Sequence, residues 1–94
     1  MTTYCLITKR GADLAGFQPV KGGKLDDVIN FTFGVLTERT KADPMMFAAL
    51  GVEWVLEEGL RDLQDLDKPA GRELGRWKMV GSLADPDLKW FGAS

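Results

Sequence analysis

The apolar positions between residues 28 and 36 fit two different periods. Every second residue from Ile29 to Val35 is apolar, as in a strand with one buried face. A helical stripe is equally complete and consists of Leu25, Val28, Ile29, Thr32, Val35 and Leu36. Gly34 would cost a helix about 1 kcal/mol relative to alanine, and aromatic and β-branched residues favour strands. We therefore predict a strand within residues 28–37 and keep a helix over residues 25–40 as the alternative.

The predicted strand fixes which side chains face the core. Phe31 and Phe33 would point inward, and Asn30 and Thr32 would point to solvent. On this interpretation Phe31→Ala should lower the free energy of unfolding by about 3–5 kcal/mol, as large-to-small changes in a core do.

The first 24 residues predict two further strands. Residues 3–9, TYCLITK, are rich in β-branched and aromatic side chains and are followed by Arg10 and Gly11. Residues 17–20, FQPV, predict a short edge strand, because Pro19 cannot donate a ladder hydrogen bond. The sequence KGGK at residues 21–24 predicts a turn.

The segment after Asp43 predicts one long helix. Asp43 can cap it and Pro44 suits its first position. Pro69 and Gly71 would end it, so that the helix spans about residues 44–67. Its apolar stripe follows a three- and four-residue spacing and consists of Met45, Ala49, Val52, Leu56, Leu60 and Leu63.

A second apolar stripe runs along the first half of the predicted helix. Phe47, Leu50 and Trp54 form it, and a helix laid on a sheet buries only one face. Either a C-terminal tail with Trp90 and Phe91 covers this stripe, or a second copy of the chain does so in a homodimer. We therefore treat these five residues as candidate protein-binding residues.

The predicted architecture is α+β. Alternation around Trp77 and Met79 indicates a last main strand, and residues 84–94 are a candidate C-terminal tail. The order is then β-β-β-α-β in a single domain, residues 1–94, with an antiparallel or mixed sheet of three or four strands under one helix. The alternative order, with residues 25–40 helical, is β-α-α-β.

Charge is concentrated after Pro44. The chain has a formal net charge of −2, but residues 44–68 hold six acidic and two basic side chains, a net of −4. In the predicted helix Glu58, Asp62 and Asp65 share a stripe, and Glu57 pairs with Arg61 four residues later. We take Glu57, Glu58, Asp62 and Asp65 as candidate contacts to a basic protein, which such a surface attracts electrostatically.

Several kinds of chemistry are disfavoured by the composition. The chain has no histidine and one cysteine, Cys5, which removes the usual general base and a structural zinc site. We read Cys5 as a buried apolar residue. The paired aspartates do not form a calcium loop. Arg72, Arg76 and Lys78 are too few for a typical nucleic-acid surface, so we expect no metal, no cofactor and no direct nucleic-acid contact.

The sequence also predicts a cytoplasmic protein without a membrane segment. The longest apolar run, residues 45–56, contains Gly51 and Glu53 and is too short to span a bilayer. The N-terminal residues lack the basic region of a secretory signal.

Three functions fit these features. The first is a non-catalytic protein-binding protein, either an inhibitor or an adaptor that docks on a basic partner. Phage proteins that act against host defences, including anti-CRISPR inhibitors, share this size and charge. The second is a small enzyme or ligand-binding subunit that uses Asp27 or Glu53, with a pocket formed by Phe31, Phe33 and Trp77. The third is an assembly component of a larger particle.

Overall fold

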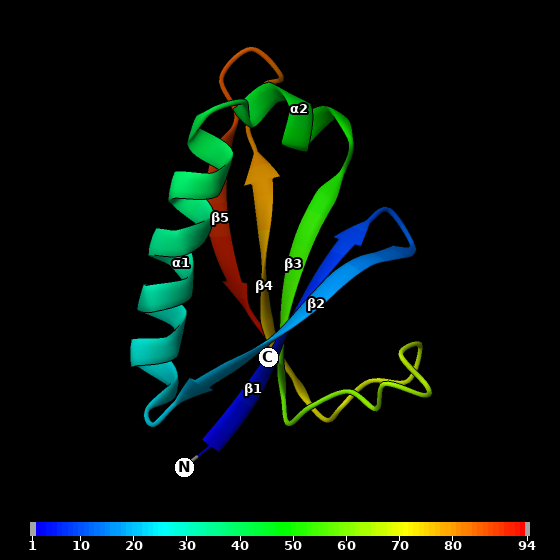
Figure 1. Ribbon diagram of the computed structural model, residues 1–94. Helices are drawn as coiled ribbons and strands as arrows, with labels where there is room; N and C mark the ends of the chain where they lie inside the picture. Colours follow the sequence, from blue (N-terminus) through cyan, green and yellow to red (C-terminus); the bar gives the residue numbers. More distant parts are fainter. Residues whose placement is uncertain (1, 94) are drawn as a thin grey trace.

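The computed structural model describes residues 2–93, which form a five-stranded sheet and two helices (Figure 1). The chain begins with the hairpin β1 (Thr2–Arg10) and β2 (Asp13–Gly22), followed by α1 (Leu25–Lys41) and α2 (Pro44–Ala49). It continues through β3 (Val52–Glu58), β4 (Glu73–Val80) and β5 (Asp87–Gly92). The sheet order is β2-β1-β3-β4-β5, and every neighbouring pair is antiparallel. The predicted α+β class is confirmed, with five strands instead of three or four.

The long helix α1 covers one face of the sheet (Figure 1). Its buried residues recur every four positions, at Val28, Thr32, Leu36 and Thr40. Asp26 and Asp27 lie in the first turn, and Arg39 and Lys41 in the last, where each charge complements the helix dipole. The core beneath α1 contains the fully buried Trp54 and Trp77.

Within residues 2–93 no helix lies on the other face of the sheet, which has a smaller core. Cys5, Ile7 and Val55 are buried there, with Leu14 and Phe17 packed against them. Cys5 is fully buried, and this burial raises the pKa of its thiol. The interpretation of Cys5 as a buried apolar residue is confirmed.

The prediction of a strand at residues 28–37 was wrong, since these residues lie within α1. Two of the four side chains face the opposite way from the strand interpretation: Phe31 is 70% exposed and Thr32 is 3% exposed. Phe33 packs against the core and Asn30 is exposed, as that interpretation had them. The alternative, a helix over residues 25–40, matches α1 closely. Gly34 is tolerated because it lies on the exposed side of the helix.

The prediction of a helix over residues 44–67 was also wrong. Only residues 44–49 are helical, and Asp43 caps this short helix by accepting a hydrogen bond from the Met46 backbone. Gly51 follows with a φ of +65°, a conformation that commonly ends a helix. Residues 52–58 then form β3, which runs between β1 and β4.

The C-terminal residues are part of the sheet. Within the candidate tail at residues 84–94, Asp87–Gly92 forms the edge strand β5, paired with β4. The indole of Trp90 approaches Gly75 so closely that a Cβ at residue 75 would lie 2.3 Å from a ring carbon. Gly75 therefore gives Trp90 the space to pack on Trp77, with 4.3 Å between the ring centroids.

Candidate protein-binding surfaces

Residues 59–72 form an irregular loop of 14 residues between β3 and β4. Loops of this length without helix or strand are uncommon in compact domains and often carry function. β3 runs from α2 toward this loop, so the loop and α2 lie at opposite ends of the sheet (Figure 1). The loop is closed at its base by a hydrogen bond from the Glu58 backbone N–H to the Arg72 carbonyl.

A buried ion pair holds the loop in shape. Both carboxylate oxygens of Glu57 accept hydrogen bonds from Arg61, at 2.9 Å to Nε and 2.8 Å to Nη2. The side chains are 5% and 8% exposed, respectively. Arg61 also donates to the Leu66 carbonyl, and the Ala70 backbone donates to Glu57. Two side chains therefore fix the loop at three separate places.

The ionisation of this pair follows from its contacts. Burial by itself raises the pKa of Glu57, but the hydrogen bonds from Arg61 and Ala70 and the charge of Arg61 outweigh that effect and lower it. The hydrogen bond to Glu57 raises the pKa of Arg61. The pair is therefore fully charged at neutral pH.

The loop presents apolar and acidic side chains together. Leu60 is 54% exposed and Leu63 is 74% exposed, while Asp62 and Asp65 are exposed beside them. Leu60, Asp62 and Asp65 line a shallow hollow together with Lys68, Pro69 and Ala70. The Asp62 carboxylate accepts from the Gln64 backbone, and the Asp65 backbone donates to the Asp62 carbonyl, so the tip is a hydrogen-bonded turn.

The four acidic residues predicted to contact a basic protein have three different environments. Asp62 and Asp65 do lie together, but on the loop. Glu58 ends β3, is exposed, and lies 3.6 Å from Arg72 in an ion pair. Glu57 is 4% exposed, so it positions the loop instead of offering a surface. The i,i+4 pairing of Glu57 with Arg61 is present, although neither residue is helical.

The predicted second apolar stripe does not exist, because its members belong to different elements. Trp54 is a core residue on β3 with 1% exposure, and Phe47 of α2 packs against it at 5.7 Å between ring centroids. Leu50, directly after α2, is 45% exposed.

The two C-terminal aromatic residues lie on opposite faces of the sheet. Trp90 packs on Trp77 beneath α1. Phe91 lies on the helix-free face, where the Nζ atoms of Lys78 and Lys89 each lie 5.7 Å from the centroid of its ring.

The helix-free face also carries a ladder of ion pairs. Glu53 on β3 pairs with Arg76 and Lys78 on β4, and Arg76 pairs with Glu73. Each of the three basic residues named from the sequence therefore contacts a carboxylate, since Arg72 pairs with Glu58. This pairing reduces the positive charge that the group can offer to a phosphate backbone.

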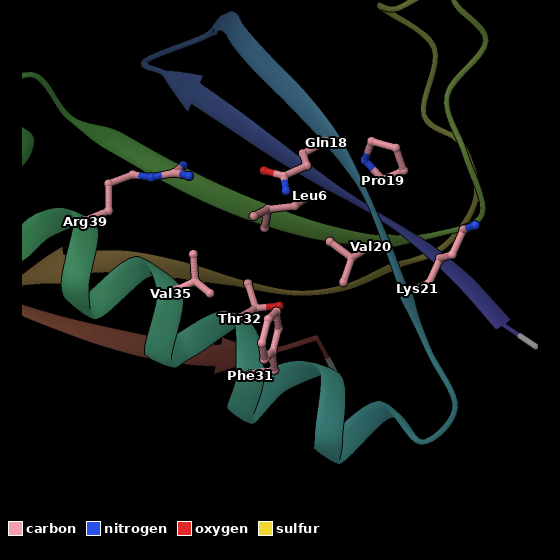
Figure 2. A pocket seen from close by; sticks show the side chains of 9 residues that line it. All are labelled: Leu6, Gln18, Pro19, Val20, Lys21, Phe31, Thr32, Val35 and Arg39. Atoms are coloured by element: carbon pink, nitrogen blue, oxygen red, sulfur yellow. The ribbon is translucent and has the colours of Figure 1, made fainter.

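A groove between α1 and β2 has no counterpart in the sequence analysis (Figure 2). Its volume is about 190 Å³. Phe31 and Val35, which line it, are exposed residues of α1. Only the helical alternative for residues 25–40 could have suggested a large aromatic residue on the outer side of a helix.

The aromatic pocket suggested for an enzyme is not assembled. Phe31 lines the groove, Phe33 lines a different hollow near Pro44, and Trp77 is fully buried in the core. Within residues 2–93, no three His, Cys, Asp or Glu side chains are grouped as a metal site would require. No helix in this part of the chain is long and apolar enough to cross a membrane.

Comparisons with known proteins give no relative: no family model, no curated protein and no solved structure matches the chain.

Proposed function

We propose that this protein is a non-catalytic protein-binding domain that docks on a basic protein surface through its 59–72 loop. The observation that carries the proposal is the pairing of two exposed leucines with two exposed aspartates on a loop held by a buried ion pair. Leu60 and Leu63 supply apolar contact area, and Asp62 and Asp65 supply the charge that attracts a basic partner.

The Glu57–Arg61 pair supports this proposal through the entropy of binding. A disordered loop must be ordered when it binds, and that ordering weakens the complex. Here Arg61, Glu57 and the Ala70 backbone already hold the loop. An inhibitor or adaptor of the kind that phages use against host defences would act in this way, and the size and charge of the chain fit that class.

The test uses charge reversal with a matched control. The variant Glu58→Lys, Asp62→Lys and Asp65→Lys changes three exposed acids on and beside the loop. The control Asp13→Lys, Asp85→Lys and Asp87→Lys changes three exposed acids elsewhere, so the net charge shifts equally. With a partner purified from host lysate, the first variant should associate more slowly and lose most of the salt dependence. The control should bind as the parent does.

Leu63 separates the apolar contribution from the charge. Leu63→Ala should mainly raise the dissociation rate, because buried apolar contacts determine how long a complex persists. Since Leu63 is 74% exposed, the variant should unfold at the same denaturant concentration as the parent. Equal association rates for the charge-reversed variant and the parent, at low and at high salt, would refute the proposed docking surface.

A further inference from the structure

The groove between α1 and β2 is a second candidate binding site, separate from the 59–72 loop. One wall is the helix, with Phe31, Thr32, Val35 and Arg39. The other wall is the sheet, where Leu6 of β1 and Gln18 and Val20 of β2 face the helix (Figure 2). Phe31 is 70% exposed at the helix side of this groove, which leaves a large aromatic surface in contact with water.

The volume of the groove limits what it can hold. Pockets for drug-sized molecules measure roughly 300–1,000 Å³, and this groove measures about 190 Å³. It is therefore too small for a typical cofactor, whereas an apolar side chain of a partner protein needs much less space. Its apolar lining residues, Leu6, Val20, Phe31 and Val35, suit such a side chain.

The charged residues at the groove indicate which charge a bound segment should carry. Lys21 and Arg39 are its charged lining residues, and both are cationic. Neither forms an ion pair with another residue among positions 2–93. In Figure 2 the Arg39 side chain extends from α1 toward Gln18, whereas the Lys21 side chain points away from α1, on the other side of β2 from Val20. An occupant with a carboxylate beside its apolar residue would meet Arg39.

The edge strand β2 favours an extended occupant over a second copy of this sheet. Among the residues that the structure describes, β2 pairs with β1 alone, so its outer backbone edge is open beside the groove. A short extended segment can lie along such an edge. Pro19 lies in the middle of β2 and has no N–H, which interrupts a continuous ladder and opposes pairing of two β2 strands across a dimer.

From these observations we propose that the groove binds an extended segment of a partner protein in which one large apolar residue stands next to an acidic residue. The apolar side chain enters between Phe31, Val35 and Val20. The adjacent carboxylate meets Arg39. This site offers a cation, Arg39, whereas the loop residues proposed to dock, Asp62 and Asp65, are acidic, and it does not depend on them.

The test is a titration of the isotope-labelled protein followed by backbone amide chemical shifts. The probe is the capped peptide Asp-Asp-Leu-Asp-Asp. The comparison peptides are Asp-Asp-Ala-Asp-Asp, which lacks the apolar anchor, and Lys-Lys-Leu-Lys-Lys, which reverses the charge. The first peptide should shift amides in residues 16–21 and 31–39, and the other two should bind more weakly.

Matched variants separate this site from the loop. Arg39→Glu should weaken binding of the probe by about fivefold or more, the effect of losing one exposed charge contact of roughly 1 kcal/mol. Lys41→Glu makes the same charge change on the same helix outside the groove and should leave binding unchanged. Asp62→Lys with Asp65→Lys should also leave it unchanged, so failure of the loop proposal does not affect this measurement.

Three results would overturn the proposed site. The first is the absence of shifts at millimolar peptide. The second is equal binding of the lysine peptide. The third is a shift of the groove amides with protein concentration alone, which would identify a second copy of this chain as the occupant.

Discussion

The buried hydroxyl of Thr32 has no hydrogen-bond partner, whereas that of Thr40 has one. Both residues lie on the buried stripe of α1. Thr40 Oγ1 donates to the Leu36 carbonyl at 2.9 Å, but Thr32 Oγ1 is buried without a bond. An unsatisfied buried polar group destabilises a fold, and its removal can be neutral or stabilising.

Thr32→Val should therefore raise the free energy of unfolding by about 1 kcal/mol. Thr40→Val is the matched control and should lower it by about the same amount, because it removes a formed hydrogen bond. Chemical denaturation of both variants measures the difference. Equal losses in the two variants would contradict the assignment of Thr32 as unpaired.

Glu57 should contribute more to stability than its neighbour Glu58. Glu57→Gln removes one partner of a buried ion pair and should lower the free energy of unfolding by about 3 kcal/mol, because Arg61 keeps its charge without compensation. Glu58→Gln changes an exposed pair at 3.6 Å and should cost well under 1 kcal/mol. Amide exchange at Ala70, which donates to Glu57, would report whether the loop also loosens.

The lowered pKa of Glu57 predicts how the loop responds to acid. A carboxyl whose pKa is lower in the folded state stabilises that state fully above the pKa of a free glutamate, about 4.3. This contribution is lost as the pH falls from there through the folded-state pKa. The protection of the Ala70 amide, measured against the intrinsic exchange rate at each pH, should therefore fall below about pH 4, and the Glu57→Gln variant should lack this pH dependence.

At the scale of elements, α1 shows why period alone could not settle the local structure. Its buried residues are Val28, Thr32, Leu36 and Thr40, of which two are polar. Threonine at a core position weakens the apolar signal of the helical stripe, while exposed Phe31 and Val35 add an alternating signal. The segment is helical because its packing against the sheet outweighs the strand propensity of its residues.

The segment from residue 44 to residue 58 misled the prediction for a different reason. β3 is buried on both faces from Trp54 to Glu57, so its apolar run does not alternate and can be fitted to a helical stripe. Gly51 was the available signal, since glycine just past a short capped helix commonly ends it. The partners of β3 are distant in sequence and could not be inferred from local pattern.

Two alanine variants on α1 test its orientation. Phe31→Ala should change the free energy of unfolding by less than about 1 kcal/mol, since most of the ring is exposed. Leu36→Ala should lower it by about 2–5 kcal/mol, since Leu36 is fully buried. Thermal or denaturant unfolding of the two variants measures both changes. A larger loss of stability for Phe31→Ala than for Leu36→Ala would mean that α1 has the reverse orientation.

At the scale of the whole molecule, the predicted homodimer has lost its original basis, because Trp54 and Phe47 are packed against each other. It stays a prediction, and exposed apolar residues now suggest a different surface. Met45, Met46 and Leu50 are 43–53% exposed on and beside α2, at the end of the sheet away from the 59–72 loop (Figure 1).

If this end is a dimer contact, the protein should sediment at micromolar concentration with twice the 10.4 kDa chain mass. Leu50→Glu should then give a monomer with unchanged thermal stability, because the half-exposed Leu50 contributes little to the core of the monomer. A parent protein that sediments at 10.4 kDa across this range would show that α2 is not a self-association surface.

In the 59–72 loop, the groups that hold the backbone in place differ from the side chains that are free to contact a partner. The anchors are Glu57, Arg61, the carbonyl of Leu66 and the N–H of Ala70. The side chains of Leu63, Gln64 and Asp65 form none of these bonds. Substitutions at these three positions should therefore cost little folding stability. If the partner changes in evolution, binding specificity can change there, while Glu57 and Arg61 keep the loop in place.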